Sequence, residues 1–332
     1  MLDKQRAEHR KLAACAAANV NKQTFFVKSI KDTSDIKRFI LPCLQHHRFN
    51  LLLNYIDSFS QWSLIEDMSE FNETKYYKLN WLENAATSII KCGHIPRHVA
   101  FIMDGNRRYA NKVNLDRAAG HKEGFDTLAK VLTWCRYLGI NEVTLYAFSV
   151  ENFKRTQDEV ESIMNLARQK CDSILDELDK VNEAGVRIRV AGDIHLLPKD
   201  LAERVETIQK MTCNNTRAYL NVCLAYTSRH ELVHSVRELA TEIHCDKSLD
   251  PNDVDLARLE KNLYIGRPFP ELIIRTSGEV RLSDFMLWQS QESILIFVKA
   301  LWPEISFWDF LKAIFYFQCQ LRFARRLAIE SH

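Results

Sequence analysis

The chain has 332 residues and a net charge of +2, because 45 Lys and Arg side chains oppose 43 Asp and Glu. Hydrophobic residues make up 46% of the sequence, which is enough for a sizeable core and excludes a wholly disordered chain. The balanced charge argues against binding to nucleic acid through bulk positive charge, so we expect no nucleic-acid partner.

Residues 1–80 show no regular alternation of strands and helices, and we interpret them as an N-terminal extension of unknown role. The first 48 residues carry ten basic and four acidic side chains. That composition suits either contact with an anionic membrane surface or a solvated tail.

From Trp81 onward, six β-rich apolar runs are separated mostly by helical patterns. Near-continuous apolar strands that alternate with helices are typical of a parallel sheet covered on both faces. We therefore predict an α/β fold, a single domain over residues 81–318 with a central, mostly parallel six-stranded sheet flanked by helices, and a short C-terminal tail over 319–332. A long helix is expected from Asp158 to Leu178. The predicted strands are Val99–Met103, Val143–Phe148, Val186–Val190, Tyr219–Ala225, Leu272–Ile274 and Ile294–Val298.

In open parallel sheets, ligands bind beyond the carboxyl ends of the strands. The first predicted strand runs directly into Asp104-Gly105-Asn106-Arg107-Arg108. A carboxylate at a strand end costs desolvation energy unless it is paired or binds a metal, and two arginines at a helix start favour a phosphate or diphosphate. Gly105 leaves room for a ligand to come close. The pattern predicts a diphosphate site with Mg²⁺ on Asp104, and a surface Asp–Arg pair beside a turn glycine is the alternative.

Three further polar clusters follow strands or precede a helix. The segment Arg275–Ser283 holds two arginines and three hydroxyl groups. Ser149–Arg155 and Arg117–His121 add more basic and polar side chains. Together the clusters predict a site with room for two anionic groups.

The segment His98–Arg108 resembles the opening motif of the cis-prenyltransferases, the undecaprenyl diphosphate synthase family. The resemblance covers residues 81–318, and the pair Arg107-Arg108 is similar to the eukaryotic catalytic branch, which makes dehydrodolichyl diphosphate. The later motifs are matched in order by Arg117–His121, Tyr146–Arg155, Arg275–Ser283, Leu287–Gln289 and Leu301–Glu304.

The resemblance implies a hydrophobic tunnel for a growing chain and repeated addition, in cis, of isopentenyl diphosphate to farnesyl diphosphate. The long-chain product would serve dolichol synthesis and protein glycosylation. By the same resemblance, Asp104 binds Mg²⁺ and helps the allylic diphosphate to leave, and Asn152 lies near the proton lost after condensation. The residues implied for the allylic diphosphate are Gly105, Asn106, Arg107, Arg108, Arg117, His121 and Arg155. Those implied for isopentenyl diphosphate are Arg275, Arg281 and Ser283.

Two departures from the family pattern bear on partners. Ile294 stands where bacterial members have a metal-binding Glu, and no Arg-x-Gly tail is found before His332. The resemblance implies a heteromer with a homologous, catalytically silent accessory subunit that supplies such a tail. It also implies a peripheral position on the cytosolic face of the endoplasmic reticulum membrane. The segment from Trp81 to Ile90 would be either a membrane-contacting helix or a helix that caps the core.

Two other functions remain as alternatives. The segment His230-Glu231-Leu232-Val233-His234 fits the His-Glu-x-x-His pattern of zinc metalloproteases. A catalytically silent scaffold subunit of the cis-prenyltransferase family would keep the fold and lose the diphosphate ligands. Asp104, Arg108, Arg275 and Arg281 are all present, which favours the enzyme.

Overall fold

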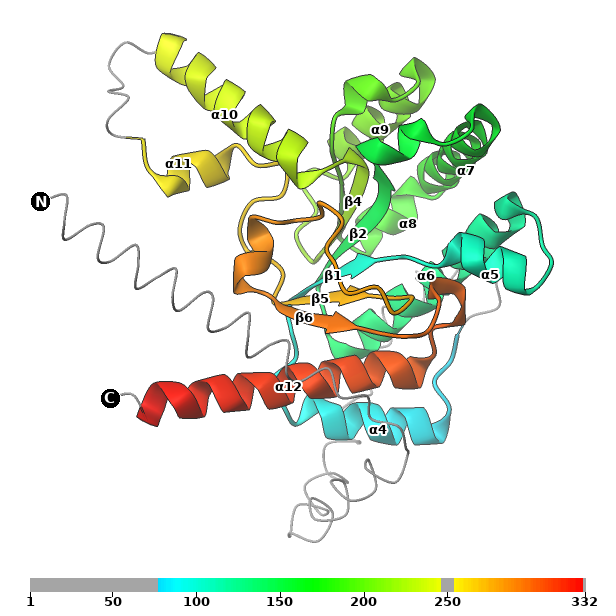
Figure 1. Cartoon of the computed structure of the whole chain (residues 1–332), viewed down its shortest axis with the longest axis vertical. Coiled ribbons are helices and arrows are strands. Elements are labelled where there is room, and N and C mark those ends of the chain that lie inside the picture. The colour runs from blue at the N-terminus through cyan, green and yellow to red at the C-terminus, as the bar shows by residue number, and fades with distance from the viewer. Residues whose placement is uncertain (1–76, 246–253, 331–332) are drawn as a thin grey trace, which may run out of the picture. The chain divides into compact units, whose positions relative to one another are not determined.

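The computed structural model describes residues 77–245 and 254–330, so the predicted extension over residues 1–80 lies almost entirely outside the described part. The chain divides into two units, Met1–Leu64 and Ile65–His332, and all described residues belong to the second. This unit has an α/β fold (Figure 1). The strands are β1 (His98–Ile102), β2 (Glu142–Ser149), β3 (Val186–Ala191), β4 (Ala218–Tyr226), β5 (Leu272–Arg275) and β6 (Ile294–Phe297). The α-helices are α4 (Trp81–Lys91), α5 (Asn106–Lys112), α6 (Arg117–Leu138), α7 (Gln157–Asp176), α8 (Leu178–Glu183), α9 (Lys199–Met211), α10 (Ser228–Cys245), α11 (Leu256–Lys261) and α12 (Phe307–Glu330). Short 3-10 helices are η3 (Val150–Lys154), η4 (Ile194–Leu196), η6 (Gln289–Glu292) and η7 (Trp302–Glu304).

The six strands form one sheet in the order β3-β4-β2-β1-β5-β6, and every neighbouring pair is parallel. The predicted sheet is confirmed, and each predicted strand agrees with the observed one to within one residue at either end. β1 lies between β2 and β5. After β1 the chain builds β2, β3 and β4 on one side of this strand, and it then adds β5 and β6 on the other side. Ligands of open parallel sheets bind at such a switch point, here the carboxyl ends of β1 and β5.

One face of the sheet is covered by α4, α6 and α12, which form the largest apolar core with it. Phe101 of β1 contacts this core, and Trp134 of α6 stacks on Phe310 of α12 with 5.9 Å between ring centroids. Helices α4 and α12 lie side by side (Figure 1) and pack together. Helix α4 therefore packs on the core, while Trp81 at its start is 80% exposed, and contact of this helix with a membrane stays a prediction. Helix α12 continues without interruption through residue 319, where the tail was predicted to begin.

On the opposite face, Ala100 and Ile102 of β1 pack against Phe285 and Met286 from the segment after β5. Helices α7 and α9 cover the β4 side. The helix predicted from Asp158 to Leu178 is slightly shorter, because α7 ends at Asp176 and α8 begins at Leu178. The tunnel implied by the resemblance stays a prediction.

A buried polar network crosses the sheet near the amino ends of its strands. The two ring nitrogens of His98 lie 2.7 Å from the Thr144 hydroxyl and 2.9 Å from the Pro268 carbonyl oxygen. The Asn221 amide donates to the same hydroxyl at 3.0 Å and to the Glu142 carboxylate at 2.9 Å. These groups bond mainly to one another, although the side-chain oxygen of Asn221 has no hydrogen-bond partner, and they lie at the end of the sheet opposite the switch point.

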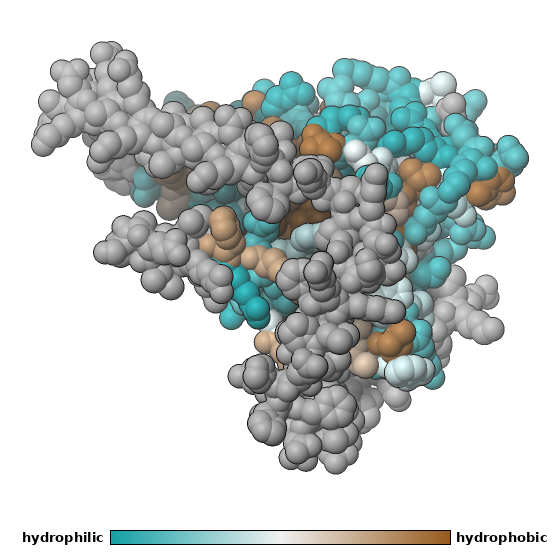
Figure 2. Space-filling view, turned by 60° about the horizontal axis from the view of Figure 1, so that its bottom comes forward, coloured by the Kyte–Doolittle hydropathy of each residue, from teal (hydrophilic) through white to brown (hydrophobic). Residues whose placement is uncertain are grey.

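The outer surface carries both hydrophobic and hydrophilic residues. On the face shown in Figure 2, hydrophobic residues of the described part lie in separate patches among hydrophilic ones. None of the helices within the described ranges is both long and apolar enough to cross a membrane.

Candidate active site

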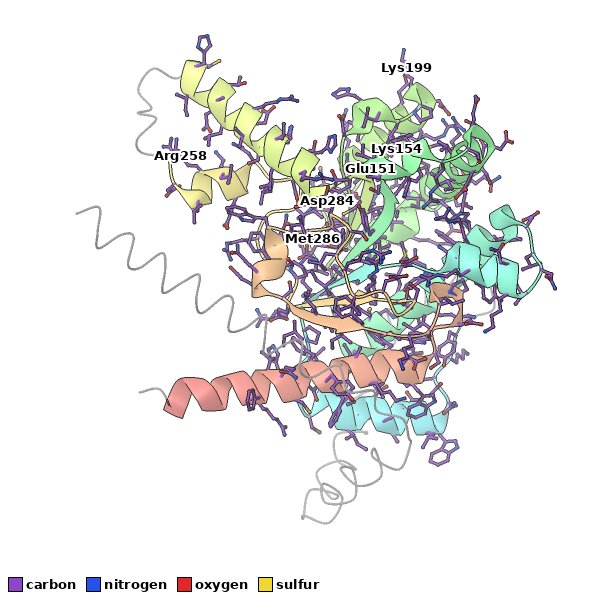
Figure 3. The ribbon with its side chains drawn as sticks, in the orientation of Figure 1. Glu151, Lys154, Lys199, Arg258, Asp284 and Met286 are labelled. Carbon is purple, nitrogen blue, oxygen red and sulfur yellow. The ribbon has the colours of Figure 1, made fainter. Side chains whose placement is uncertain are left out.

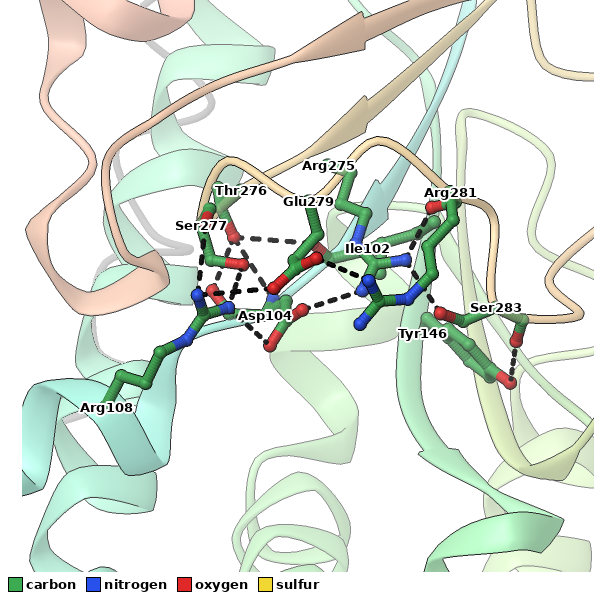
Figure 4. Close-up of polar contacts among 10 residues, drawn as sticks. All are labelled: Ile102, Asp104, Arg108, Tyr146, Arg275, Thr276, Ser277, Glu279, Arg281 and Ser283. Atoms are coloured by element: carbon green, nitrogen blue, oxygen red, sulfur yellow. Dashed lines mark hydrogen bonds and ion pairs between the residues drawn. The ribbon is translucent and has the colours of Figure 1, made fainter.

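Asp104 lies two residues beyond the end of β1 and is tied to the segment after β5. The parallel pairing places Ile102 opposite Arg275, which brings Thr276 beside Asp104. The main-chain N–H of Asp104 donates to the Thr276 hydroxyl oxygen at 3.1 Å, and that hydroxyl donates to the Asp104 carbonyl oxygen at 2.7 Å. Because these bonds hold the main chain, the carboxylate is presented in a fixed direction (Figure 4).

Two arginines hold the Asp104 carboxylate. Nη2 of Arg275 donates to one oxygen at 2.7 Å, and Nη2 of Arg108 lies 3.5 Å from the other. Burial would raise the pKa of Asp104, but hydrogen bonds from Arg275 and Ser277 and the charges of Arg275 and Arg108 together lower it. Asp104 is therefore an ionised carboxylate, and its side chain is 32% exposed.

Arg275 links Asp104 to the segment that bears Arg281 and Ser283. It is 3% exposed, and its Nη1 donates to the Ser283 hydroxyl oxygen at 2.7 Å and to the Arg281 carbonyl oxygen. The guanidinium of Arg281 pairs with Glu279. The three residues predicted to bind isopentenyl diphosphate are thus brought together (Figure 4).

The neighbouring arginines Arg107 and Arg108 contact different groups. Arg108 donates to the Ser277 carbonyl oxygen at 3.3 Å and lies 3.5 Å from Glu279. Arg107 instead lies 3.9 Å from the buried carboxylate of Glu159 on α7. The contacts around Asp104 and those around Glu159 form the two halves of the site, and the binding of one diphosphate by both arginines stays a prediction.

The second half of the site is built around Glu159. Arg155 pairs with this carboxylate at 2.8 Å, and Arg107 lies near it. Burial, followed by the charge of Arg155, lowers the pKa of His121, so its ring is neutral, and its Nε2 is buried without a hydrogen-bond partner. Burial and Arg107 lower the pKa of Arg155, whereas the charges of Glu159 and Asp104 oppose that shift. Arg155 is therefore within electrostatic reach of both halves.

The surroundings of four other predicted site residues differ from one another. Gly105 has φ +114°, and a Cβ there would lie 3.0 Å from Leu301, so the turn and this contact both favour glycine, while the predicted approach of a ligand stays a prediction. The side-chain oxygen of Asn106 is buried without a hydrogen-bond partner. That of Asn152 accepts a hydrogen bond from the Ser149 N–H at 3.0 Å, which closes the turn after β2. The side chain of Arg117 lies outside the described part of the chain.

A divalent metal fits Asp104 only if a ligand supplies the other oxygens. Over residues 77–245 and 254–330, no group of three or more His, Cys, Asp or Glu side chains could hold a metal ion. Mg²⁺ needs no such cage, because it is usually bound by one or two carboxylates together with substrate phosphates. Ile294 is level with Val99 in the sheet, five residues before Asp104, and β5 lies between the two strands.

The His-Glu-x-x-His segment lies at the start of α10, and its Glu231 takes part in hydrogen bonds inside the protein. The carboxylate of Glu231 is fully buried and accepts hydrogen bonds from the Tyr226 hydroxyl at 2.5 Å, the Ile265 N–H and the Gln289 amide. His234 stacks on Tyr264 with 4.6 Å between ring centroids. Because Glu231 is held in this way, the geometry gives no support to a zinc metalloprotease.

Four functional side chains were not predicted as site residues: Thr276, Ser277, Glu159 and Glu279. Three of them fall within the Arg275–Ser283 cluster, in which only Arg275, Arg281 and Ser283 were assigned a role. Glu159 follows Arg155 by four residues, the spacing at which helical neighbours pair, and that spacing could have identified it.

Comparison with known proteins identifies the family of the chain. The model of a family described as putative undecaprenyl diphosphate synthase matches residues 102–324. A human dehydrodolichyl diphosphate synthase complex subunit is 52% identical over 242 residues, which cover 73% of this chain and 72% of the human protein. A tritrans,polycis-undecaprenyl-diphosphate synthase of Methanopyrus kandleri is 41% identical over 230 residues, 69% of this chain and 84% of that protein.

A solved structure has the same fold. The crystal structure of lavandulyl diphosphate synthase from Lavandula x intermedia in complex with dimethylallyl diphosphate has a TM-score of 0.63 and 30% identity. The match covers 68% of this chain and 96% of that one. The chain therefore belongs to the undecaprenyl diphosphate synthase family of prenyltransferases, and the resemblance found in the sequence is confirmed.

Proposed function

We propose that this chain catalyses the repeated, cis condensation of isopentenyl diphosphate onto farnesyl diphosphate. The long-chain product would be dehydrodolichyl diphosphate, which serves dolichol synthesis and protein glycosylation. The names of the human relative and of related complex subunits support this product.

One observation carries the proposal: in the described part of the chain, a cluster of five arginines shares three carboxylates beyond the carboxyl ends of the strands. The carboxylates are Asp104, Glu159 and Glu279. The arginines are Arg107, Arg108, Arg155, Arg275 and Arg281. This excess of positive charge suits two diphosphates, one in each half of the site.

The two halves suit two substrates. Arg107, Arg155 and His121 would hold the allylic diphosphate beside Glu159. Arg275, Arg281 and Ser283 would hold isopentenyl diphosphate. Arg108, between the halves, would bind an oxygen of either. Bound Mg²⁺, held by Asp104 and phosphate oxygens, would stabilise the negative charge that develops on the departing diphosphate.

The arginines would also stabilise the negative charge on the departing diphosphate. They are fixed by Asp104, Glu159 and Ser283 before substrate arrives, so little reorganisation is needed as charge develops. The allylic C–O bond breaks, a new C–C bond forms, and the condensing unit loses one proton. Asn152, at the turn after β2, would lie near that proton.

We further propose that the active form is a heteromer with a homologous accessory subunit, placed peripherally on the cytosolic face of the endoplasmic reticulum membrane. The human relative is named as a complex subunit, which supports the heteromer. Trp81 and Leu82 of α4 are 80% and 48% exposed, which supports contact of this helix with lipid.

Incorporation of labelled isopentenyl diphosphate onto farnesyl diphosphate with Mg²⁺ tests the proposal. The full chain is assayed alone, with a candidate accessory subunit, and as Asp104→Ala with that subunit. Long-chain product from the pair that is lost in the variant is expected. Product from neither wild-type arrangement would overturn the proposal in favour of a catalytically silent subunit. Equal rates with and without the accessory subunit would overturn only the heteromer.

A further inference from the structure

We propose that Asp284 and Arg229 are positioning residues for the isopentenyl diphosphate half of the site, acting through Ser283 and Arg275. The inference rests on the proposed function. It concerns a pair of side chains outside the arginine cluster, one of them at the start of α10.

The segment after Arg281 has an unusual main-chain conformation. Ser283, Asp284 and Met286 have φ values of 50°, 61° and 45°, although none of them is glycine. They are three of the six non-glycine residues with positive φ in the described ranges. Such conformations persist only where the surrounding structure holds them in place.

The start of α10 holds this segment at Asp284. The Asp284 carboxylate accepts hydrogen bonds from the Arg229 N–H at 3.2 Å and from Arg229 Nε at 2.7 Å. Its carbonyl oxygen accepts from the Ser228 N–H at 2.7 Å. The first N–H groups of a helix have no partner within the helix and favour a negative charge, so Asp284 caps α10 from a distant part of the chain. Figure 3 shows Asp284 at the foot of this helix.

A second bond fixes the other end of the same segment. The Leu287 N–H donates to the Ser228 hydroxyl oxygen at 3.0 Å. The Asp284 carboxyl side chain is only 12% exposed, whereas that of Arg229 is 73% exposed. Asp284 is therefore the principal anchor, and Arg229 strengthens it from the surface.

The anchored segment in turn orients the site. Ser283, the residue before Asp284, accepts Arg275 Nη1 at its hydroxyl oxygen, 2.7 Å away. Its carbonyl oxygen accepts the Tyr146 hydroxyl at 3.1 Å. Because Arg275 also holds Asp104 at 2.7 Å, an unbroken series of contacts leads from α10 to the Asp104 carboxylate. Release of Asp284 would free Ser283 and Arg281, while Arg107 and Arg155 would keep Glu159 as their partner.

The test compares KM for the two substrates in the full chain with its accessory subunit. Asp284→Ala is expected to raise KM for isopentenyl diphosphate at least tenfold and to change KM for farnesyl diphosphate less than twofold. Asp284→Asn, which keeps an acceptor for the Arg229 N–H, should shift KM less, and Arg229→Ala should shift it least. Asp255→Ala is the matched control, because Asp255 caps α11 by accepting the Arg258 N–H at 2.9 Å.

Three outcomes would overturn the inference: an unchanged KM for isopentenyl diphosphate in Asp284→Ala, an equal rise of both KM values, or the same effect in Asp255→Ala. Calorimetric binding of isopentenyl diphosphate separates this inference from the proposed function. If the wild-type chain shows no turnover but binds isopentenyl diphosphate, and Asp284→Ala weakens that binding tenfold, the proposed catalysis is overturned and the positioning role is supported.

Discussion

The two ends of the sheet both carry buried polar side chains, but they differ in how these are paired. At the amino end, His98, Thr144, Asn221 and Glu142 bond mainly to one another. At the carboxyl end, arginines outnumber carboxylates, and Asp104 is one-third exposed. At the amino end, the polar groups are therefore nearly all paired within the protein. At the carboxyl end, the excess positive charge is left for an anionic ligand. Changes at the first should affect stability, and changes at the second should affect turnover.

The largest effect should follow the loss of the central carboxylate. In Asp104→Ala, kcat should fall about 10²- to 10³-fold, the usual cost of removing one group that stabilises developing charge. Steady-state kinetics of the heteromer measure this, and thermal unfolding checks that the variant stays folded, with a lower Tm expected because the buried Arg275 loses one charged hydrogen bond. More than half of wild-type activity in this variant would contradict the role given to Asp104.

A smaller loss is expected at the arginine that joins the two strands. Arg275→Gln removes charged hydrogen bonds to Asp104 and Ser283, each worth about 1.5–3 kcal/mol. We expect kcat/KM for isopentenyl diphosphate to fall about 10- to 150-fold. Glu292→Gln, a change at an exposed salt bridge outside the site, is the control and should leave kcat/KM within twofold. Equal losses in both variants would indicate a general structural defect.

At the amino end the expected effect is on stability alone. Thr144→Val leaves His98 Nε2 and one Asn221 N–H without their partner, so the free energy of unfolding should fall by about 1–3 kcal/mol. Urea denaturation measures this change, and kcat/KM should stay within twofold of wild type. Normal stability together with an altered KM in this variant would contradict the claim that the amino end affects stability alone.

The smallest expected effect is a pH dependence. Burial lowers the pKa of His98, as does Arg189, while Glu142, the Pro268 carbonyl and Glu271 oppose it. Because the folded-state pKa is below the unfolded value of about 6.5, the unfolded chain takes up the proton first, and stability present above pH 6.5 is lost as the pH falls. Tm should therefore drop by about 2–4 °C between pH 7.5 and 5.5 relative to His98→Gln. Parallel Tm curves for the two proteins would exclude this contribution.

The fold could be predicted because its signals are local. Buried parallel strands need nearly continuous apolar runs, and the run from Val99 to Met103 fixes the position of β1 almost to the residue. The end of α7 was harder to place, because the helical pattern of apolar residues continues through the interruption at Glu177.

The site could be predicted only as a set of residue types. Asp104, Arg275 and Ser283 were expected and do meet. That Arg107 and Arg108 would face different partners follows from the rotation of about 100° per residue in a helix, but which partners they meet depends on the packing of α7 and the β5 segment. The burial of Glu159 and the anchoring by Asp284 depend on contacts between residues far apart in the sequence, which a residue pattern cannot show.

The bond between Asp104 and Arg275 joins residues 171 positions apart. During synthesis on the ribosome, β1 emerges long before β5, so until then Asp104 has no Arg275 and the central strand has one unpaired edge. Non-local pairings of this kind are slow to form. The isopentenyl diphosphate half of the site thus exists only once the last third of the domain has been made, whereas the pairing of Arg107 and Arg155 with Glu159 needs no residue of β5.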